Sequence, residues 1–275
     1  MSDMTARFPT AEESNRGRMA SKQSGGAHTS RTMLLAELSV VLAQCDPTSS
    51  LDQYREAVID SNVTGKESLS SRQRTFRYLR ELYALDLNVP EFRAFVRLWR
   101  RERLGRPAMA LLLAASRDAL LLATAGAVLA WPEGQPVHSS DLADAVEARY
   151  PGSYSSSIRA KIGRNALSSW TQAGYLVRVG RGPAIRNAFD PSPAAVAMAL
   201  VIGATEGASG ERLFSGESAK LLHAPLQTLH DRAHDASRKG WLEYRSLGSV
   251  TEVDLTKLLA EASDIRLPLM GGDPK

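Results

Sequence analysis

Residues 155–186, SSSIRAKIGRNALSSWTQAGYLVRVGRGPAIR, predict a helix followed by a tight β-hairpin. Ser155 is a residue type that caps helix N-termini, and Gly174 suits the C-terminal end because glycine adopts the left-handed conformation found there. The β-type residues 175–189 are interrupted by the glycines and the proline of 180–183, a pattern typical of strand, turn and strand.

A shorter helix precedes this segment. Ser140 can cap a helix that runs through Arg149, and the sequence Pro151-Gly152-Ser153 breaks that helix. Helix, turn, helix and β-hairpin in this order form the outline of a winged helix-turn-helix, which we predict for residues 137–191.

The helix predicted at 155–173 has two distinct faces. At roughly 100° per residue, one stripe is apolar and is expected to be buried: Ile158, Ile162, Ala166 and Trp170. The opposite side carries Ser, Lys, Arg and Ser, which suits a DNA major groove because Lys and Arg neutralise phosphates and Arg can donate two hydrogen bonds to guanine. The predicted nucleic-acid contacts of this module are Ser157, Arg159, Lys161, Arg164 and Ser168 on the helix, and Arg178, Arg181 and Arg186 on or beside the wing.

Basic residues are unevenly distributed along the chain, although the formal net charge is only +4. Residues 149–186 contain seven basic and no acidic residues, and residues 66–106 contain 11 basic and five acidic residues. One-sided charge attracts a polyanion such as nucleic acid, or an acidic face of another protein. A basic stretch that only keeps the surface solvated is the remaining alternative.

Residues 32–131 have a helical pattern throughout, which predicts an N-terminal α-helical bundle. Within it, helices are predicted at 33–44, 51–61, 71–85 and 91–104. The helix at 71–85 has apolar side chains on one face and arginines on the other. These arginines extend the predicted contact surface: Arg72, Arg74, Arg77 and Arg80.

Residues 192–267 repeat the outline of helices followed by strand, turn and strand. Three helices are predicted here, around 193–208, at 215–223 and at 225–239. The outer side of the third helix carries Asp231 and Asp235, whose carboxylates would repel phosphate. We therefore expect this second winged-helix-like module to be structural or protein-binding. The predicted fold class is mainly α, with short β-hairpin wings.

The two ends of the chain lack apolar periodicity, so residues 1–31 are predicted to be a disordered tail and residues 268–275 a loose one. Residues 109–131 are apolar enough to suggest a membrane span. Arg117 and Asp118 lie near the middle of that stretch and would each cost about 2.5–3.5 kcal/mol in a bilayer. We expect the stretch to belong to the helical bundle, and we expect no contact with a membrane.

No motif in the sequence indicates catalysis. His230 and His234 are one helical turn apart, a spacing that two metal ligands can use, but no cysteine accompanies them. Phosphate-binding loops, nucleophile elbows and the HExxH pattern are missing. We expect a non-enzymatic protein without metal or cofactor. Cys45 is the only cysteine, which excludes an intramolecular disulfide and fits the reducing cytoplasm.

Three stretches of the sequence are similar to one protein family. The run Asn62-Val63-Thr64-Gly65-Lys66, followed by Ser71-Arg72 and Leu79-Arg80-Glu81-Leu82-Tyr83, resembles the N-terminal signature of BrxA proteins, small accessory subunits of bacteriophage-exclusion (BREX) defence systems. The segment Ser116-Arg117-Asp118 and residues 167–176 (LSSWTQAGYL) are also similar to that family.

The resemblance covers roughly residues 33–255 and implies a helical, NusB-like or helix-turn-helix-containing protein that binds nucleic acid in phage defence. It also implies that Lys66, Arg72 and Arg80 join the basic surface. The Ser/Gly-rich start and the extended C-terminal end depart from compact members of the family.

Three functions remain open from the sequence. The first is a DNA-binding accessory protein that positions other defence-system subunits on double-stranded DNA. The second is an assembly subunit whose basic faces dock an acidic protein partner. The third is an RNA binder of antitermination type, which the arginine-rich helices at 71–104 suggest.

Overall fold

The computed structural model describes residues 26–178, 180, 182–248 and 250–260. The protein is mainly helical, with 60% helix and 8% strand, and its strands form small antiparallel sheets. The predicted mainly α class is therefore confirmed.

The N-terminal half is a bundle of helices packed around aromatic and leucine side chains. Its elements are η1 (Ala27–Thr29), α2 (Leu35–Gln44), α3 (Leu51–Ile59), α4 (Leu69–Tyr83), α5 (Pro90–Arg101) and α6 (Arg106–Arg117). Ser50 and Gln53 form a capping box that starts α3. The ring of Phe95 on α5 stacks on that of Tyr83 on α4, with centroids 6.1 Å apart. The four helices predicted here are present, with ends within three residues of their predicted positions.

The apolar stretch 109–131 folds as separate helices. After α6 come α7 (Ala119–Ala123) and α8 (Ala125–Ala130), and the chain bends by 102° between α6 and this pair. The Asp118 carboxylate accepts hydrogen bonds from the backbone N–H groups of Leu120 and Leu121, so it caps α7. Among the described residues, no single helix is long and apolar enough to cross a membrane, and only this bent pair passes by length and composition.

Two helices and a small sheet follow the bundle. They are β1 (Pro136–Val137), α9 (Ser139–Arg149), α10 (Ser156–Gln172), β2 (Leu176–Arg178) and β3 (Ala184–Arg186). The strands are antiparallel in the order β1-β3-β2, with Val137 opposite Ala184 and Leu176 opposite Arg186. The predicted order of helix, helix and hairpin is present. Strand β1 was not predicted, because a two-residue strand has no periodic pattern.

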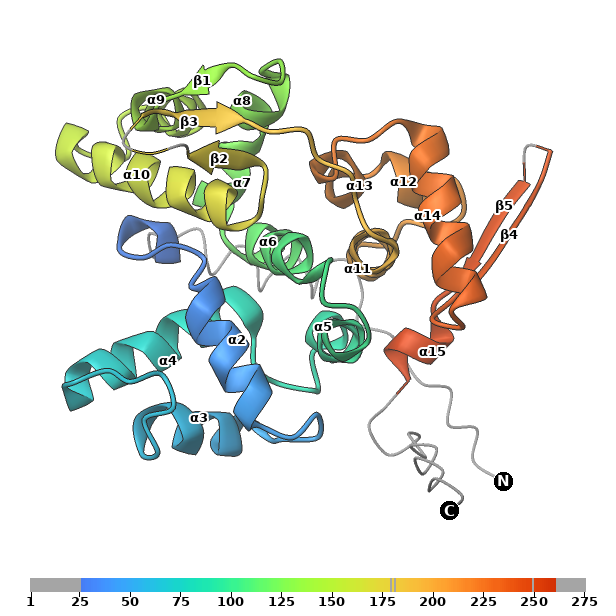
Figure 1. Cartoon of the computed structure of the whole chain (residues 1–275), viewed down its shortest axis with the longest axis horizontal. Coiled ribbons are helices and arrows are strands. Elements are labelled where there is room, and N and C mark those ends of the chain that lie inside the picture. Colours follow the sequence, from blue (N-terminus) through green and yellow to red (C-terminus); the bar gives the residue numbers. More distant parts are fainter. Residues whose placement is uncertain (1–25, 179, 181, 249, 261–275) are drawn as a thin grey trace.

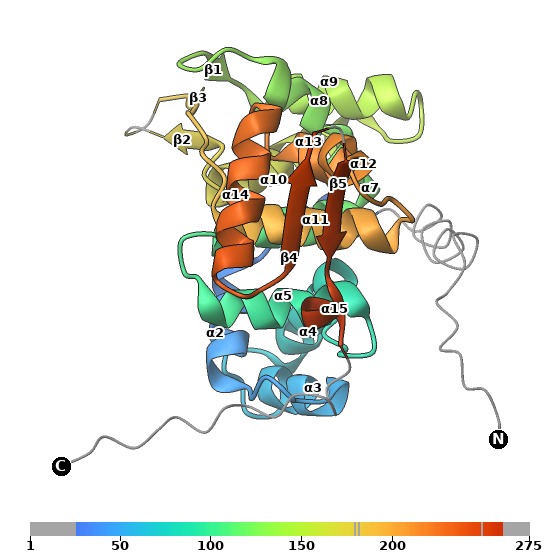
Figure 2. The same ribbon diagram turned by 90° about the vertical axis from the view of Figure 1, so that its right-hand side faces the viewer.

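The C-terminal part surrounds one fully buried helix. Its elements are α11 (Pro193–Thr205), α12 (Arg212–Ser215), α13 (Glu217–Leu221), α14 (Leu226–Arg238), β4 (Glu243–Leu247), β5 (Val250–Asp254) and α15 (Thr256–Leu259). All side chains from Ala194 to Ile202 are buried, because α11 packs against α5 and α6 on one side and against α13 and α14 on the other. The hairpin of β4 and β5 stands beside α14, as Figure 2 shows.

One hydrophobic core joins these parts, since a single cluster of buried side chains extends from Ala27 to Leu258. Figure 1 shows α5, α6 and α11 at the centre, with α2–α4, α7–α10 and α12–α14 placed around them. The prediction of a disordered tail through residue 31 is wrong for its last part, because Ala27 and His28 are fully buried. The rest of the two predicted tails, residues 1–25 and 268–275, lies outside the described residues.

Candidate nucleic-acid interface

Helix α10 is held in place by its buried face. Ile162, Ala166 and Trp170 are each 0% exposed, as the apolar stripe predicted. The Trp170 indole N–H donates to the Thr124 hydroxyl at 2.8 Å, which ties α10 to the start of α8. Gly163 lets α9 approach closely, because a Cβ there would lie 2.1 Å from the Ser139 carbonyl oxygen. These contacts fix which side of α10 faces outward.

The outward side of α10 carries the predicted polar set. Ser157, Lys161 and Arg164 are exposed, and Ser168 is half-buried. We call these four residues the α10 face. The Ser168 hydroxyl accepts a hydrogen bond of 3.2 Å from the Gln172 amide, so it is the least available of the four. Ile158 was expected to be buried but is 43% exposed, since it lies in the first turn, where the cover by neighbouring elements ends.

Arg159 does not lie on the α10 face. Its guanidinium forms a short ion pair with the Glu147 carboxylate of α9. The same carboxylate accepts from the Gly152 N–H at 3.1 Å, so the two side chains bridge the turn between α9 and α10. The hydrogen bond from Arg159 holds the pKa of Glu147 below its usual value. The predicted contact of Arg159 with a phosphate stays a prediction, and the phosphate would have to displace the Glu147 carboxylate.

Arg186 was predicted to contact nucleic acid beside the wing, but it is only 2% exposed. Its guanidinium donates to the backbone carbonyls of Tyr175, at 3.2 Å, and of Asn187. It also lies 3.0 Å from His223 Nδ1 and 5.7 Å from the centroid of the Tyr175 ring. Burial, and then the charge of Arg186, lower the pKa of His223. Arg186 thus links β3 to the C-terminal part and is not available to a ligand.

The hairpin contributes one exposed cation among the described residues. Arg178, at the end of β2, is exposed, as is the neighbouring Val177. Arg181, the other predicted wing residue, lies outside the described residues.

Helix α4 presents a second basic surface. Arg74, Arg77 and Arg80 are exposed, as predicted. The guanidinium of Arg77 lies 4.7 Å from the centroid of the Tyr78 ring, and that of Arg31 approaches the same ring at 5.9 Å. Arg31 was missed because it falls in the segment predicted to be a tail. The short segment η1 contacts both α4 and α10, so it connects this surface to α10.

Lys66 and Arg72 have structural partners instead. Lys66 Nζ forms an ion pair with Glu37 of α2 at 2.8 Å. The Arg72 guanidinium donates to the carbonyls of Lys66 and Ile59, so it closes the loop between α3 and α4. Both residues are half-buried. Their predicted contact with nucleic acid stays a prediction, and a phosphate would have to compete with these partners for the same cations.

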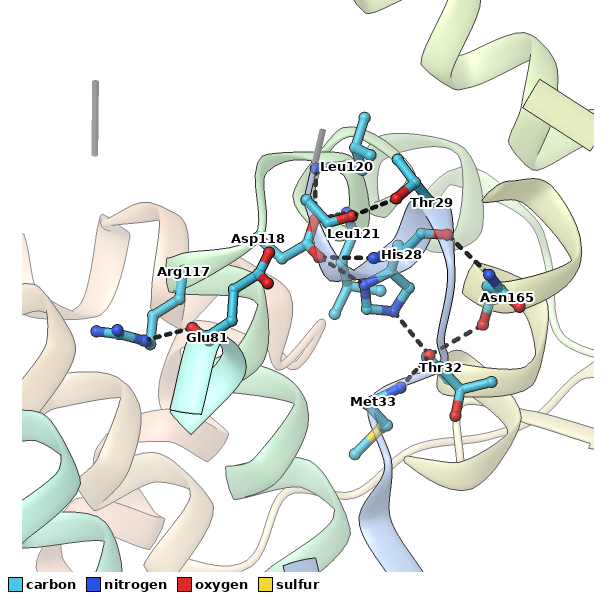
Figure 3. A network of polar contacts seen from close by, with 12 residues as sticks. His28, Thr29, Thr32, Met33, Glu81, Arg117, Asp118, Leu120, Leu121 and Asn165 are labelled. Carbon is cyan, nitrogen blue, oxygen red and sulfur yellow. Dashed lines mark hydrogen bonds and ion pairs between the residues drawn. The ribbon is translucent and has the colours of Figure 1, made fainter. Parts of the chain in front are cut away.

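A buried polar network, which the sequence analysis missed, fixes α10 on the bundle (Figure 3). The Asp118 carboxylate accepts from the backbone N–H of His28 at 3.0 Å and lies 2.8 Å from His28 Nδ1. His28 Nε2 lies 2.8 Å from the Ser169 hydroxyl of α10. Ser169 also accepts from the Met33 N–H at 2.9 Å, and the Asn165 amide donates to the His28 carbonyl at 2.8 Å.

Ser169, His28 and Asp118 are hydrogen-bonded in the order of a nucleophilic triad. They are buried, however, whereas the serine of such a triad must be accessible to substrate. His28 and Ser169 are 0% exposed and Asp118 is 3% exposed, so no substrate can reach the hydroxyl. Burial would raise the pKa of Asp118, but His28 and the backbone N–H donors outweigh it and keep the pKa below its usual value. The network is a hydrogen-bonded clamp between η1, α10 and the start of α7. Its one signal in the sequence is Asp118, a carboxylate inside an apolar run that requires a partner.

The outer side of α14 carries both signs of charge, as predicted. Asp231 is exposed and Asp235 is half-buried. Arg232 pairs with Asp190 at 2.7 Å and with Asp235 at 3.6 Å, so its charge is balanced locally. His230, the first of the predicted histidine pair, lies 2.8 Å from the Tyr244 hydroxyl and 3.1 Å from Glu211, so both of its ring nitrogens have protein partners.

Comparison with known proteins gives no match to any protein-family model and none to a curated protein.

Proposed function

We propose that the chain binds double-stranded DNA through the α10 face, with Arg178 of the hairpin beside it. The observation that carries this proposal is the outward position of Lys161 and Arg164 on a helix whose other side is fixed in the core. Neither cation forms an ion pair with another described residue, so both charges are available to phosphates or guanine.

The arrangement of the elements supports a winged helix-turn-helix. In that motif the second helix enters the major groove and the hairpin contacts the backbone beside it. We assign α10 to the place of the second helix, because it follows α9 along the chain and because β2 of the hairpin contacts it. Helix α4 supplies an additional contact through Arg74, Arg77 and Arg80, because η1 links α4 to α10.

The proposed role is that of a non-enzymatic cytoplasmic accessory protein in a BREX-type phage defence system, where it would position other subunits on DNA. This part of the proposal rests on the resemblance to BrxA proteins. The chain is purified with and without nuclease treatment. If a large methyltransferase or ATPase subunit copurifies with it only when nuclease is left out, assembly on DNA is supported. Recovery that nuclease treatment does not change would instead favour direct docking of a protein partner.

Fluorescence anisotropy with a labelled duplex tests DNA binding directly. The logarithm of affinity should fall by about 0.9 per phosphate contact for each tenfold increase in salt. Lys161→Glu combined with Arg164→Glu should weaken binding by roughly 100-fold, since each such contact is worth about 1–3 kcal/mol. Absence of binding to any duplex at low salt would contradict the proposal.

A matched control reverses two charges elsewhere. Arg238 and Arg245 lie on α14 and β4 with side chains 73% and 76% exposed. Arg238→Glu with Arg245→Glu changes the net charge by the same amount and should leave affinity within about threefold. An equal loss in both double variants would show that only net charge matters. Stronger binding to a structured RNA than to the duplex would identify an RNA protein instead.

A further inference from the structure

A cleft lies where the three parts of the chain meet. It has a volume of about 530 Å³ and is lined by α6–α8, by the end of α9, by residues of α13 and by Glu206, which follows α11. The volume falls within the range of about 300–1,000 Å³ that is usual for small-molecule sites. The cleft contains neither the α10 face nor any residue of the buried clamp, so it is separate from both.

The floor of the cleft is apolar. Leu112, Leu122 and Leu129 contribute large side chains, and small residues beside them keep the space open. Gly126 of α8 is one of these small residues, and a Cβ added to it would meet no atom within 4 Å. An apolar body of a ligand can therefore lie on this floor and lose its contact with water.

The walls carry cations from three different elements. Arg117 ends α6, Arg149 ends α9, and Lys220 belongs to α13. The Arg117 Nε donates to the Glu81 carbonyl at 2.9 Å, which fixes the position of its guanidinium. The Arg149 guanidinium lies 5.4 Å from the centroid of the Tyr150 ring, another lining residue.

Two carboxylates, Glu206 and Glu217, also line the cleft, so the cations exceed them by one. Burial lowers the pKa of Arg117, since its charge is partly removed from water, and the carboxylates of Glu91 and Glu81 offset part of this effect. A partly desolvated cation gains from an anionic partner more than a fully solvated one does. An apolar floor with a cationic excess on its walls is complementary to an amphipathic anion.

We propose that this cleft binds a small organic monoanion with an apolar body, such as an aryl sulfonate or aryl carboxylate. The apolar body would lie on the leucines of α6–α8, and the anionic group would face Arg117, Arg149 and Lys220. This inference does not depend on DNA binding.

The probe is 8-anilinonaphthalene-1-sulfonate, with N-phenyl-1-naphthylamine as its neutral counterpart. Titration of the full chain should show saturable binding of one sulfonate probe, tighter than that of the neutral compound. Gly126→Leu should weaken binding of both compounds by about tenfold, because the new side chain occupies the floor. Ala130→Leu, on the same helix but outside the cleft, should change neither affinity.

Charge recognition is tested at Lys220, which is exposed. Lys220→Glu should weaken the sulfonate by about fivefold, an effect expected of a partly exposed ion pair, and should leave the neutral compound unchanged. Circular dichroism of each variant checks that the fold is retained. Binding of the sulfonate that Gly126→Leu does not weaken, or equal affinity of the two compounds for the native chain, would overturn the proposal.

Discussion

Replacing Gly163 by alanine should destabilise the protein, although alanine is the better helix former. The added Cβ would lie 2.1 Å from the Ser139 carbonyl oxygen and 3.0 Å from the Ala143 nitrogen, both backbone atoms of α9. Helices α9 and α10 must then separate by about 0.9 Å to restore a contact of 3.0 Å. Alanine returns about 0.5–1 kcal/mol of helix propensity, whereas overpacking costs about 1–3 kcal/mol. Since neither clashing atom can rotate away, we expect a net loss of about 2 kcal/mol.

Urea unfolding followed by circular dichroism measures this loss, and Gly126→Ala is its matched control. Gly126 is also a helical glycine, but its Cβ would meet nothing within 4 Å, so this variant should gain about 0.5–1 kcal/mol. The two substitutions have the same chemistry and opposite expected signs. If Gly163→Ala is as stable as the native chain, α9 and α10 do not approach each other in solution as closely as this distance of 2.1 Å requires.

Three further predictions concern buried and surface charges. Asp118→Ala should cost about 3–5 kcal/mol at neutral pH, because it leaves His28 buried without its partner. The pKa of Asp118 is lowered in the folded state, so its stabilising contribution is complete above about pH 4 and is lost as the pH falls through the folded pKa. The urea midpoints of the native chain and of Asp118→Ala should therefore converge in acid. A constant difference between them down to about pH 2 would contradict this role. Arg186→Met should destabilise the fold by about 3 kcal/mol, because it removes the hydrogen bonds from a buried guanidinium to the carbonyls of Tyr175 and Asn187. It should leave the DNA affinity of the folded protein unchanged, as measured by anisotropy after correction for the folded fraction. Arg159→Ala should cost at most about 1 kcal/mol, since its pair with Glu147 is partly exposed, and a larger shift of the urea midpoint would show that the bridge holds the turn.

Local patterns predicted much of the fold and part of the candidate interface. The helical period placed Lys161 and Arg164 on the outside of α10 and Trp170 inside, because the faces of a long helix follow from residue spacing alone. The burial of Arg186 is also predictable from a local pattern, the alternation of side chains along β3. Side chains alternate along a strand, and Arg186 therefore lies on the same side of β3 as the buried Ala184.

Contacts between distant segments could not be predicted in this way. His28 bonds to Asp118 across 90 residues and to Ser169 across 141 residues. No periodicity links such positions, so the sequence pattern alone does not distinguish the ordered segment from Gly26 onward from a disordered tail. Similarly, the uniformly apolar sequence of α11 predicts a helix that is buried on all sides, but it does not predict which elements cover that helix.

Because of the hydrogen bonds of α10, the predicted DNA-binding module cannot be separated from the rest of the chain without loss of contacts. Its side chains at 165, 169, 170 and 172 bond to residues 28, 33, 35 and 124, all outside residues 137–191. A fragment cut at the boundaries of the helix-turn-helix would lose each of these partners and expose a core tryptophan. The orientation in which this helix would meet a ligand thus depends on residues 28–35 and 124, and grafting the motif onto another protein would transfer its sequence without the contacts that orient it.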